Sequence, residues 1–411
     1  MLVLCPHFEP DTAPTGVVMT RLVHELAARG HRVHVVTALP WYREHRVDTR
    51  WTNVGWRNRT ESTRWGSVTR LQPFAGSDRR NLLRRALGFV GFSSLAVVAG
   101  WRAGRHSEGR RPDAVIAMSP PLTLGLAAWI VARFRRAPMI FNVQDVFPDA
   151  AVATGAISNR WVIAAARFLE KFVYRRSAAV TVLSEELADN VRRKLPERAR
   201  QRVVTIPNFV DTSVIVPMDR MTRYREQLGL DEGPVVMYAG NVGFSQSMDL
   251  VVAAARALPR VWFVVNGGGS ALEALRDSAA ELPNVVFGDF QPAEKLSEVL
   301  ATGDVHVVPL RRGLGSVSVP SKTYSIMAAG RPIVAAIDEG TEVRRLIERS
   351  GGGVAVPPDE PDSFVAALRE LIDDPVRASS MGAAARLLVE GEASPSAVAA
   401  EYSDLIDRTA R

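Results

Sequence analysis

Short apolar runs alternate with longer amphipathic segments along the first half of the chain. The apolar runs cover residues 1–5, 32–37, 68–71, 113–118, 139–143 and 178–183. Helical patterns lie between them and include residues 17–29, 83–102, 122–135 and 161–175. Short continuous apolar runs are typical of strands buried on both faces, and alternation with helices is typical of a parallel sheet. We therefore predict an α/β fold whose first domain is doubly wound.

A segment bracketed by prolines, residues 207–217, follows a further strand at 202–206 and indicates a domain boundary. The alternation then restarts, with strands expected at residues 235–239, 261–265, 285–287, 305–309, 333–336 and 354–356. We predict two Rossmann-like domains, residues 1–206 and 207–392, facing each other across a cleft. A break at Ser394 and Pro395 lies beside the last helix, residues 393–411, which we expect to cross back onto the first domain.

The composition agrees with two soluble domains. The chain has 411 residues, of which 47% are hydrophobic and 23% charged, and this length is about two or three times that of a usual domain. The single cysteine, Cys5, excludes an internal disulfide and is expected to be buried in the first strand. We find no secretory signal pattern at the N-terminus and expect a cytoplasmic protein.

The positive charge is concentrated in residues 1–111, which hold eighteen arginines against eight acidic residues. An apolar segment, residues 86–101, lies within this region, and its sixteen residues are fewer than the roughly 20 that span a bilayer. Arginines flank it at positions 79, 80, 84 and 85 and at 102, 105, 110 and 111. The segment suits the anionic inner face of a plasma membrane, and a buried helix with arginine caps is an equally good interpretation. No nucleic-acid motif is present, so we expect no nucleic-acid partner.

Loops at the carboxyl ends of parallel strands are the usual ligand positions in such a sheet. In the first domain they are residues 6–16, where Pro14 and Gly16 shape a turn, the loop beginning at Ser119, and a loop that carries Asp145 and Asp149. The two acids could orient sugar hydroxyls. They could instead cap a helix and form hydrogen bonds with the local backbone, and we favour this structural role.

Three loops rich in glycine follow strands of the second domain, at residues 240–247, 267–270 and 310–325. Glycine allows positive φ and close approach of the backbone to a ligand, so the three loops predict a nucleotide-binding face. The third loop has Arg311 and Arg312 at its entrance and Lys322 at the start of a helix, where phosphate binds favourably. Lysine is rare in this chain, with four residues against 47 arginines. We expect this loop to grip a diphosphate, although an ordinary basic surface loop stays an alternative.

Six segments in this order resemble a known family. They are FEPDTAPTG with ELAARGHRVHVVT, MSPPLTLGLAAW, QDVFPDAAVATGAI, VTVLSEEL with VVTIPNFVD, YAGNVGFSQSMD and SVPSKTYSIMAAGRPIVA. The family is that of the family 4 retaining glycosyltransferases with the GT-B fold. Within it, the chain is similar to the branch of colanic-acid and O-antigen fucosamine transferases that builds bacterial surface polysaccharides. The resemblance covers nearly the whole length.

The resemblance implies that the second domain holds a UDP- or GDP-sugar and the first domain holds a glycan or polyprenyl-diphosphate-linked acceptor. It places these residues at the donor: Gly240, Asn241, Gly243, Gln246, Ser247, Gly267, Gly268, Gly269, Phe287, Phe290, Ser318, Pro320, Ser321, Tyr324 and Ser325. It places these at the acceptor: Pro14, Thr15, Gly16, Ser119 and Asp149. The catalytic candidates are Lys322, Arg312 and Asp145.

The chain departs from the family at several places. Asn241 and Ser247 stand near an Arg and a Lys that many members carry, and Val317 and Ser325 stand near two glutamates. Gln144 replaces a histidine that commonly precedes the first-domain acid. We expect Lys322 to be the main phosphate cation, with no cofactor, no essential metal ion and no enzyme nucleophile, because the leaving phosphate takes the acceptor proton. Two alternatives stay open: a nucleotide-sugar 2-epimerase, which acts without an acceptor, and a non-catalytic, membrane-associated assembly partner.

Overall fold

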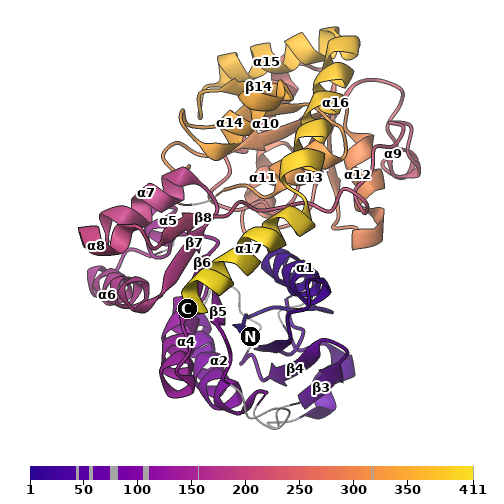
Figure 1. Cartoon of the computed structure of the whole chain (residues 1–411). Helices are drawn as coiled ribbons and strands as arrows, with labels where there is room; N and C mark the ends of the chain where they lie inside the picture. The colour runs from indigo at the N-terminus through magenta and orange to yellow at the C-terminus, as the bar shows by residue number, and fades with distance from the viewer. Residues whose placement is uncertain are drawn as a thin grey trace. The chain divides into compact units, whose positions relative to one another are not determined.

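The computed structural model describes residues 1–42, 46–54, 59–74, 82–104, 111–155, 157–315, 317 and 319–410 (Figure 1). It divides into two compact units. The first unit is Met1–Pro207 together with Pro395–Arg411, and the second is Asn208–Ser394. These limits lie within two residues of the boundaries expected from the sequence.

The first unit contains an eight-stranded sheet with the order β3-β4-β2-β1-β5-β6-β7-β8. All neighbouring strands are parallel except β3 and β4, which are antiparallel. The strands are β1 (Leu2–Leu4), β2 (Val33–Ala38), β3 (Arg59–Thr63), β4 (Gly66–Leu71), β5 (Val115–Ser119), β6 (Met139–Val143), β7 (Ala179–Val182) and β8 (Val203–Thr205). The sequence did not predict β3, because this edge strand reads RTEST and none of its residues is buried.

Helices cover both faces of this sheet. They are α1 (Pro14–Ala28), η1 (Thr49–Val54), α2 (Leu82–Arg102), α4 (Leu122–Arg135), α5 (Asp149–Ala153), α6 (Arg160–Arg176), α7 (Glu185–Arg193), α8 (Glu197–Arg200) and α17 (Pro395–Ala410). Phe141 of β6 contacts the side of α4 at Gly125, and α2, α4 and α6 pack in series (Figure 1). The next residue, Asn142, points to the other face, where its Nδ2 donates to the Tyr402 hydroxyl of α17 at 2.6 Å. The doubly wound prediction is confirmed for this unit.

Helix α2 corresponds to the apolar segment with arginines on both sides. Phe92, Ala96 and Ala99 are buried on its inner side, whereas Leu87 and Val90 are at least half exposed. The buried side agrees with a helix of the first unit. In the part of the chain that the structure describes, no helix is long and apolar enough to cross a membrane. Of the flanking arginines, residues 79, 80, 105 and 110 lie outside the described residues.

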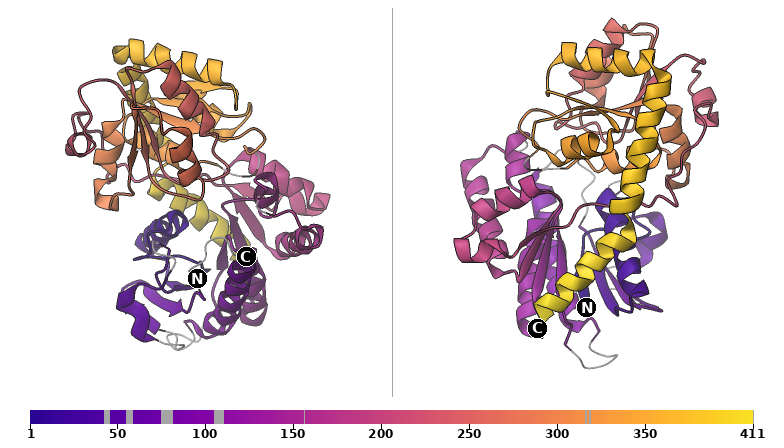
Figure 2. Two further views of the ribbon diagram at one scale, coloured as in Figure 1. Left: turned by 180° about the vertical axis from the view of Figure 1, so that it is seen from behind. Right: turned by 45° about the horizontal axis from the view of Figure 1, so that its top comes forward.

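The second unit contains a six-stranded parallel sheet with the order β11-β10-β9-β12-β13-β14. Figure 2 shows this unit from two further sides, with most of its strands and helices in orange and yellow. Its strands are β9 (Val235–Ala239), β10 (Trp262–Asn266), β11 (Val285–Gly288), β12 (Val305–Pro309), β13 (Ile333–Ala336) and β14 (Gly353–Val356). Its helices are α9 (Arg223–Gln227), α10 (Asp249–Ala257), α11 (Leu272–Ser278), η2 (Ala293–Lys295), α12 (Leu296–Thr302), α13 (Lys322–Ala328), α14 (Glu342–Ser350), α15 (Pro361–Asp373) and α16 (Pro375–Glu392). All six predicted strands of this half are confirmed.

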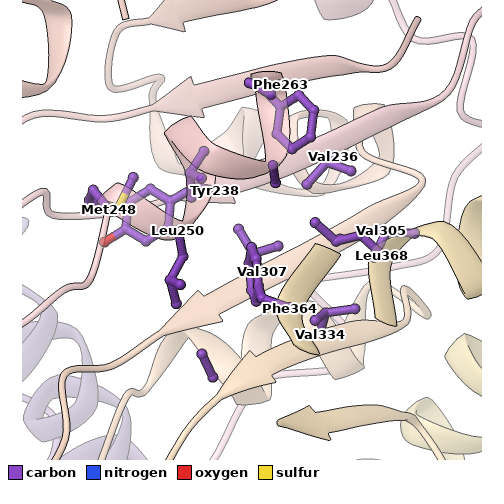
Figure 3. Packing of buried hydrophobic residues seen from close by; sticks show 14 of the residues in the cluster. Val236, Tyr238, Met248, Leu250, Phe263, Val305, Val307, Val334, Phe364 and Leu368 are labelled. Atoms are coloured by element: carbon purple, nitrogen blue, oxygen red, sulfur yellow. The ribbon is translucent and has the colours of Figure 1, made fainter. Parts of the chain in front are cut away.

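Alternate residues of β9 pack on opposite faces of the second sheet. Val236 and Tyr238 join the main core, to which α15 contributes Phe364 and Leu368 (Figure 3). Val235 and Met237 face a smaller cluster that includes Tyr224 of α9. Helices therefore cover this sheet on both faces as well, which leaves the loops at the strand ends as the open positions for ligands.

Candidate functional site

Strand order reverses once in the second sheet, between β9 and β12. From β9 the chain adds β10 and β11 on one side, and from β12 it adds β13 and β14 on the other. In open α/β sheets, ligands bind outside the carboxyl ends of the strands at such a reversal. Two of the predicted loops leave from this point and pair with each other, because the Ser247 N–H donates to Pro309 at 3.0 Å and the Arg311 N–H donates to Ser245 at 3.0 Å.

The glycines after β10 are required by contact with the neighbouring loop. Gly267 has φ +143°, and a Cβ built on it would lie 2.1 Å from the carbonyl oxygen of Gly240. Gly269 has φ +154°, and its Cβ would lie 2.1 Å from the carbonyl oxygen of Val242. These two glycines therefore admit protein backbone and fix one loop against the next, and their contact with the donor stays a prediction.

Lys322 lies close to the loop that follows β9, residues 240–247. It is the first residue of α13, and a Cβ built on Gly240 would lie 3.2 Å from its Nζ. The same Nζ lies 3.6 Å from the centre of the Tyr238 ring. Gly240 has φ +133°, so the loop folds back over the lysine where a larger residue would be strained. The structure thus brings together Gly240 and Lys322, which the sequence placed at one diphosphate.

The ammonium group of Lys322 is buried and has no hydrogen-bond partner among the residues that the structure describes. The residue as a whole is half-buried. Burial disfavours the charged form and lowers the pKa of Lys322 from 10.5 to about 7. The face of the Tyr238 ring stabilises a nearby cation by about 0.5–2 kcal/mol, less than a buried charge needs. The surroundings of the Lys322 ammonium are therefore suited to binding an anion.

Arg312 is directed elsewhere. Its Nη2 donates to the carbonyl oxygen of Pro358 at 2.8 Å and lies 3.7 Å from Glu360. Its guanidinium group therefore lies against the loop between β14 and α15. The structure does not place Arg312 and Lys322 as two cations around one position, which was the arrangement expected from the sequence.

The remaining polar residues of the first loop shape the loop itself. The Gln246 Oε1 accepts from the Gly243 N–H at 2.8 Å, and its Nε2 donates to Ser245. Asn241 extends toward Gly243, since its Nδ2 lies 2.9 Å from a Cβ built there. The Ser247 hydroxyl donates to the Oδ1 of Asp359. The side chains of Gln246 and Ser247 are therefore engaged in protein contacts.

Asp359 is a residue of this site that sequence reasoning missed. It follows β14 and adopts φ +61°, a conformation that few residues other than glycine take. Its Oδ1 accepts from Ser247 and its Oδ2 accepts from the Arg312 N–H at 3.1 Å, so one carboxylate ties together the loops after β9 and β12. Asp338 accepts from the adjacent Gly313 N–H at 2.7 Å. An acidic residue directly after a predicted strand was the available signal.

Other predicted donor residues are spread around this edge. Tyr324 is only 2% exposed and its hydroxyl is buried, and its contact with the donor stays a prediction. Phe290 is exposed and lies beside Gly268, where a ligand could reach it. Phe287 is half-buried under the guanidinium of Arg276 at 4.8 Å. Three more partly accessible residues are Pro320, Ser321 and Ser325, and Ser318 lies outside the described residues.

In the first unit the predicted acceptor loop is shorter than expected. Pro14, Thr15 and Gly16 form the first turn of α1, because proline favours the first helical position. A Cβ on Gly16 would lie 2.8 Å from that of His7, so this glycine lets the helix approach the loop after β1. Ser119 is the buried last residue of β5.

The two acids of the third loop differ in their surroundings. Asp149 is the first residue of α5, and its Oδ2 lies 2.7 Å from the Nζ of Lys194, which also contacts Glu170 at 2.5 Å. Burial raises the pKa of Glu170, and Lys194 opposes this effect. Asp149 thus belongs to an ion-pair cluster, in line with the structural role favoured from the sequence. Asp145 is half-buried between β6 and α5.

Comparison with known proteins agrees with this geometry. Residues 15–208 match the model of a glycosyl transferase 4-like domain, and residues 233–374 match that of glycosyl transferases group 1. The chain belongs to the family 4 glycosyltransferases, which have the GT-B fold. The resemblance inferred from the six sequence segments is therefore confirmed.

Relatives and solved structures extend over most of this glycosyltransferase. It is 26% identical over 386 residues to the colanic acid biosynthesis glycosyl transferase WcaI of Escherichia coli, covering 90% of this chain and 92% of that protein. It is 28% identical to the glycosyltransferase WbjE of Pseudomonas aeruginosa, covering 77% and 78%. Sucrose-phosphate synthase of Thermosynechococcus elongatus has the same fold, with a TM-score of 0.75, 17% identity and coverage of 99% and 98%. HepE of Anabaena, solved with UDP and glucose, has a TM-score of 0.70, 14% identity and coverage of 99% and 100%.

Replacement of Asp359 tests its role in holding the two loops of this glycosyltransferase. Asp359→Gly keeps the backbone conformation and removes the carboxylate, so the Ser247 hydroxyl and the Arg312 N–H lose their acceptor. It should weaken binding of the nucleoside diphosphate that the sequence predicts for this site by about 10-fold. Asp359→Asn keeps one acceptor oxygen and should lose less. Isothermal titration calorimetry measures both. Equal binding by the parent and the glycine variant would contradict the role.

Proposed function

We propose that this glycosyltransferase moves a sugar from a nucleoside-diphosphate donor to a glycan or polyprenyl-linked acceptor during assembly of a cell-surface polysaccharide or glycoconjugate. The observation that carries the donor class is the buried Lys322 ammonium at the strand-order reversal of the second sheet. Two comparisons support the proposal, one for the donor and one for the pathway. HepE, of the same fold, was solved with UDP-glucose, and WcaI is named for colanic acid biosynthesis.

Lys322 would act on the leaving group. When the bond between the anomeric carbon and the diphosphate oxygen breaks, the electron pair stays with the diphosphate, whose negative charge increases. A cation already fixed at that position stabilises this charge without rearrangement, and the loss of one such group typically costs about 10²- to 10³-fold in rate. We expect the leaving phosphate to take the acceptor proton, which gives retention of configuration without an enzyme nucleophile.

The proposal has two further parts, which concern metal ions and catalytic activity. We propose that the reaction needs no divalent ion, as expected from the sequence. We also propose that the protein is an active transferase and not a non-catalytic assembly partner, since an assembly partner would not need a buried ammonium at an anion site. An epimerase of the same fold would convert the nucleotide-sugar without any acceptor, so product analysis with and without acceptor separates it from a transferase.

Lys322→Met should make the protein more stable and unable to bind its donor. Methionine fills the same space without a charge, so the midpoint of thermal unfolding should rise, with a stability gain of about 1 kcal/mol or more. The folded pKa of about 7 lies below the unfolded value of 10.5, so the lysine destabilises the folded state most fully below pH 7. The gain should therefore be larger at pH 6 than at pH 9.

The same experiment screens the donor. UDP, GDP, dTDP, ADP and CMP are added in turn, and a diphosphate at 100 times its Kd should stabilise the parent by about 2.7 kcal/mol. Lys322→Met should show no such shift, whereas Lys295→Met, at an exposed lysine of the same unit, should respond like the parent. Absence of any shift in the parent, or an equal shift in Lys322→Met, would contradict the proposed function.

The affinity for the diphosphate should fall as pH rises above 7. With a pKa of about 7, Lys322 is largely neutral at higher pH, and binding of an anion then requires uptake of a proton. The Kd should increase by up to about tenfold per pH unit between pH 7.5 and 9. Calorimetry in buffers of different ionisation enthalpy measures the proton uptake directly. A Kd that stays constant over this range would show that Lys322 does not titrate with binding.

We also propose that the first unit binds an anionic membrane surface. Helix α6 carries Trp161 and Phe168, which are 71% and 75% exposed and lie two turns apart on one side. Arg167 and Lys171 are exposed on the same helix. Exposed aromatic residues flanked by basic ones suit the headgroup region of a bilayer with anionic lipids. This supports a peripheral location at the inner face of the plasma membrane.

The double change Trp161→Ser with Phe168→Ser should weaken sedimentation with phosphatidylglycerol vesicles by at least about fivefold, because the apolar contact with the bilayer is lost. Vesicles of phosphatidylcholine alone should retain little of either protein. As a control, Val376→Ser removes an exposed apolar side chain of the second unit and should sediment like the parent. Undiminished sedimentation of the double variant would count against membrane binding through α6.

A further inference from the structure

The first sheet also reverses its strand order once, between β1 and β5. From β1 the chain adds β2, and then β4, on one side, and from β5 it adds β6, β7 and β8 on the other. The loop that leaves β1 carries His7 and Asp11, neither of which was selected from the sequence. Both are buried, with side-chain exposures of 11% and 3%. The usual ligand position of such a sheet is therefore occupied by a buried histidine and aspartate.

The two side chains form a hydrogen-bonded pair. The Nδ1 of His7 lies 2.7 Å from the Oδ2 of Asp11. The carboxylate also accepts from the N–H groups of Trp41 and Tyr42, which follow β2, at 3.5 and 3.3 Å. Contacts from the segment after β2 and from its own loop thus hold Asp11 in place, and Asp11 in turn orients the imidazole.

Two aromatic rings and a glycine pack around the imidazole. The rings of Trp41 and Tyr42 each lie 5.4 Å from the His7 ring, the second nearly perpendicular to it. Gly16 of α1 lies against its Cβ, and any larger residue at that position would clash. The position and rotation of the ring are therefore determined from three elements of the first unit, as in a site built for one geometry.

The bond to Asp11 determines what the other ring nitrogen can do. An ionised carboxylate only accepts, so Nδ1 carries the hydrogen, and in the neutral ring Nε2 presents a lone pair. His7 Nε2 makes no hydrogen bond to any residue in the described part of the chain. This nitrogen is not fully buried, so a ligand can reach it, and an oriented acceptor at the usual ligand position of the sheet suits a ligand that donates a hydrogen bond.

We propose that His7 Nε2 accepts a hydrogen bond from the acceptor hydroxyl that receives the sugar, with Asp11 as its positioning residue. This rests on the proposed function, because it assigns the acceptor of that reaction. A hydroxyl is a group that can donate a hydrogen bond to such a ring nitrogen. Asp145 and Asp149 are at the end of β6, two strands away from β1, so the contact is distinct from the acids expected at the acceptor from the sequence.

Two substitutions separate this role from simple packing. His7→Asn keeps an amide N–H that reaches Asp11 and removes the group at the Nε2 position. His7→Gln places an amide oxygen near the Nε2 position and should recover part of the activity. Asp11→Asn reverses the bond, since its amide donates to Nδ1 and leaves the hydrogen on Nε2. His31→Asn is the control, because His31 precedes β2, at the amino ends of the strands, and forms a hydrogen bond with Ser403.

Sugar transfer is measured with the nucleotide-sugar donor whose nucleotide the thermal screen identifies. The acceptors are octyl glucoside, octyl galactoside and octyl mannoside. Release of nucleoside diphosphate without any acceptor is measured in parallel. His7→Asn and Asp11→Asn should lose about 10- to 100-fold in kcat/KM for the octyl glycoside while donor hydrolysis and nucleotide stabilisation stay at the parent level. The control should equal the parent. Transfer by His7→Asn within threefold of the parent would overturn the inference.

A second measurement does not depend on any acceptor or donor. Nitrogen-15 NMR of histidine-labelled parent protein, with the His7 signals assigned by their absence in His7→Asn, reports which ring nitrogen carries hydrogen. A neutral ring at pH 7.5 with hydrogen on Nδ1 supports the inference. Hydrogen on Nε2, in a neutral or a charged ring, overturns it. Failure of the nucleotide screen would overturn the proposed function instead, and the two failures are seen in different experiments.

Discussion

The single reversal of strand order in each sheet is the constraint on which the rest of this structure depends. Strands are added on both sides of the reversal, so no crossover helix covers the loops that leave it. In the second sheet the nearby polar group is Lys322, and in the first it is His7. The Lys322 ammonium and the His7 imidazole each have a donor or acceptor that the described fold does not use. The fold thus holds two polar groups in place at the positions where its topology leaves space for a ligand.

The energetics of Lys322 explain why its position indicates function. A buried ammonium without a counterion destabilises the folded state, and the Tyr238 ring compensates only in part. Nothing in the core of the second unit requires a cation there, since Val236, Phe263 and Phe364 pack without it. A residue that costs stability and gives no packing advantage is typical of a binding site. The same argument applies with less force to His7, which has one satisfied nitrogen.

Much of the fold could be predicted from the sequence because parallel strands buried on both faces read as continuous apolar runs. The run at residues 305–309 became β12 without change, whereas β3 was missed because its residues, RTEST, are polar and none is buried. The site was predicted in part. Lys322 and Gly240 were found together because a rare lysine and a strand-end glycine are visible in sequence, and the donor class itself stays a proposal. Asp359 and the pair of His7 and Asp11 were missed, because their roles come from contacts between loops that are distant in sequence or from one bond inside a loop.

The account is tested most directly by hydrogen–deuterium exchange of the full chain with and without the nucleoside diphosphate that stabilises it. A ligand held at the reversal of the second sheet orders the loops that leave β9 and β12. Peptides covering residues 240–248 and 310–328 should then gain protection, while those from β11 and β14, which lie at the sheet edges, should exchange as before. Protection confined to edge strands or to the first unit would contradict the claim that the strand-order reversal and Lys322 form the donor site.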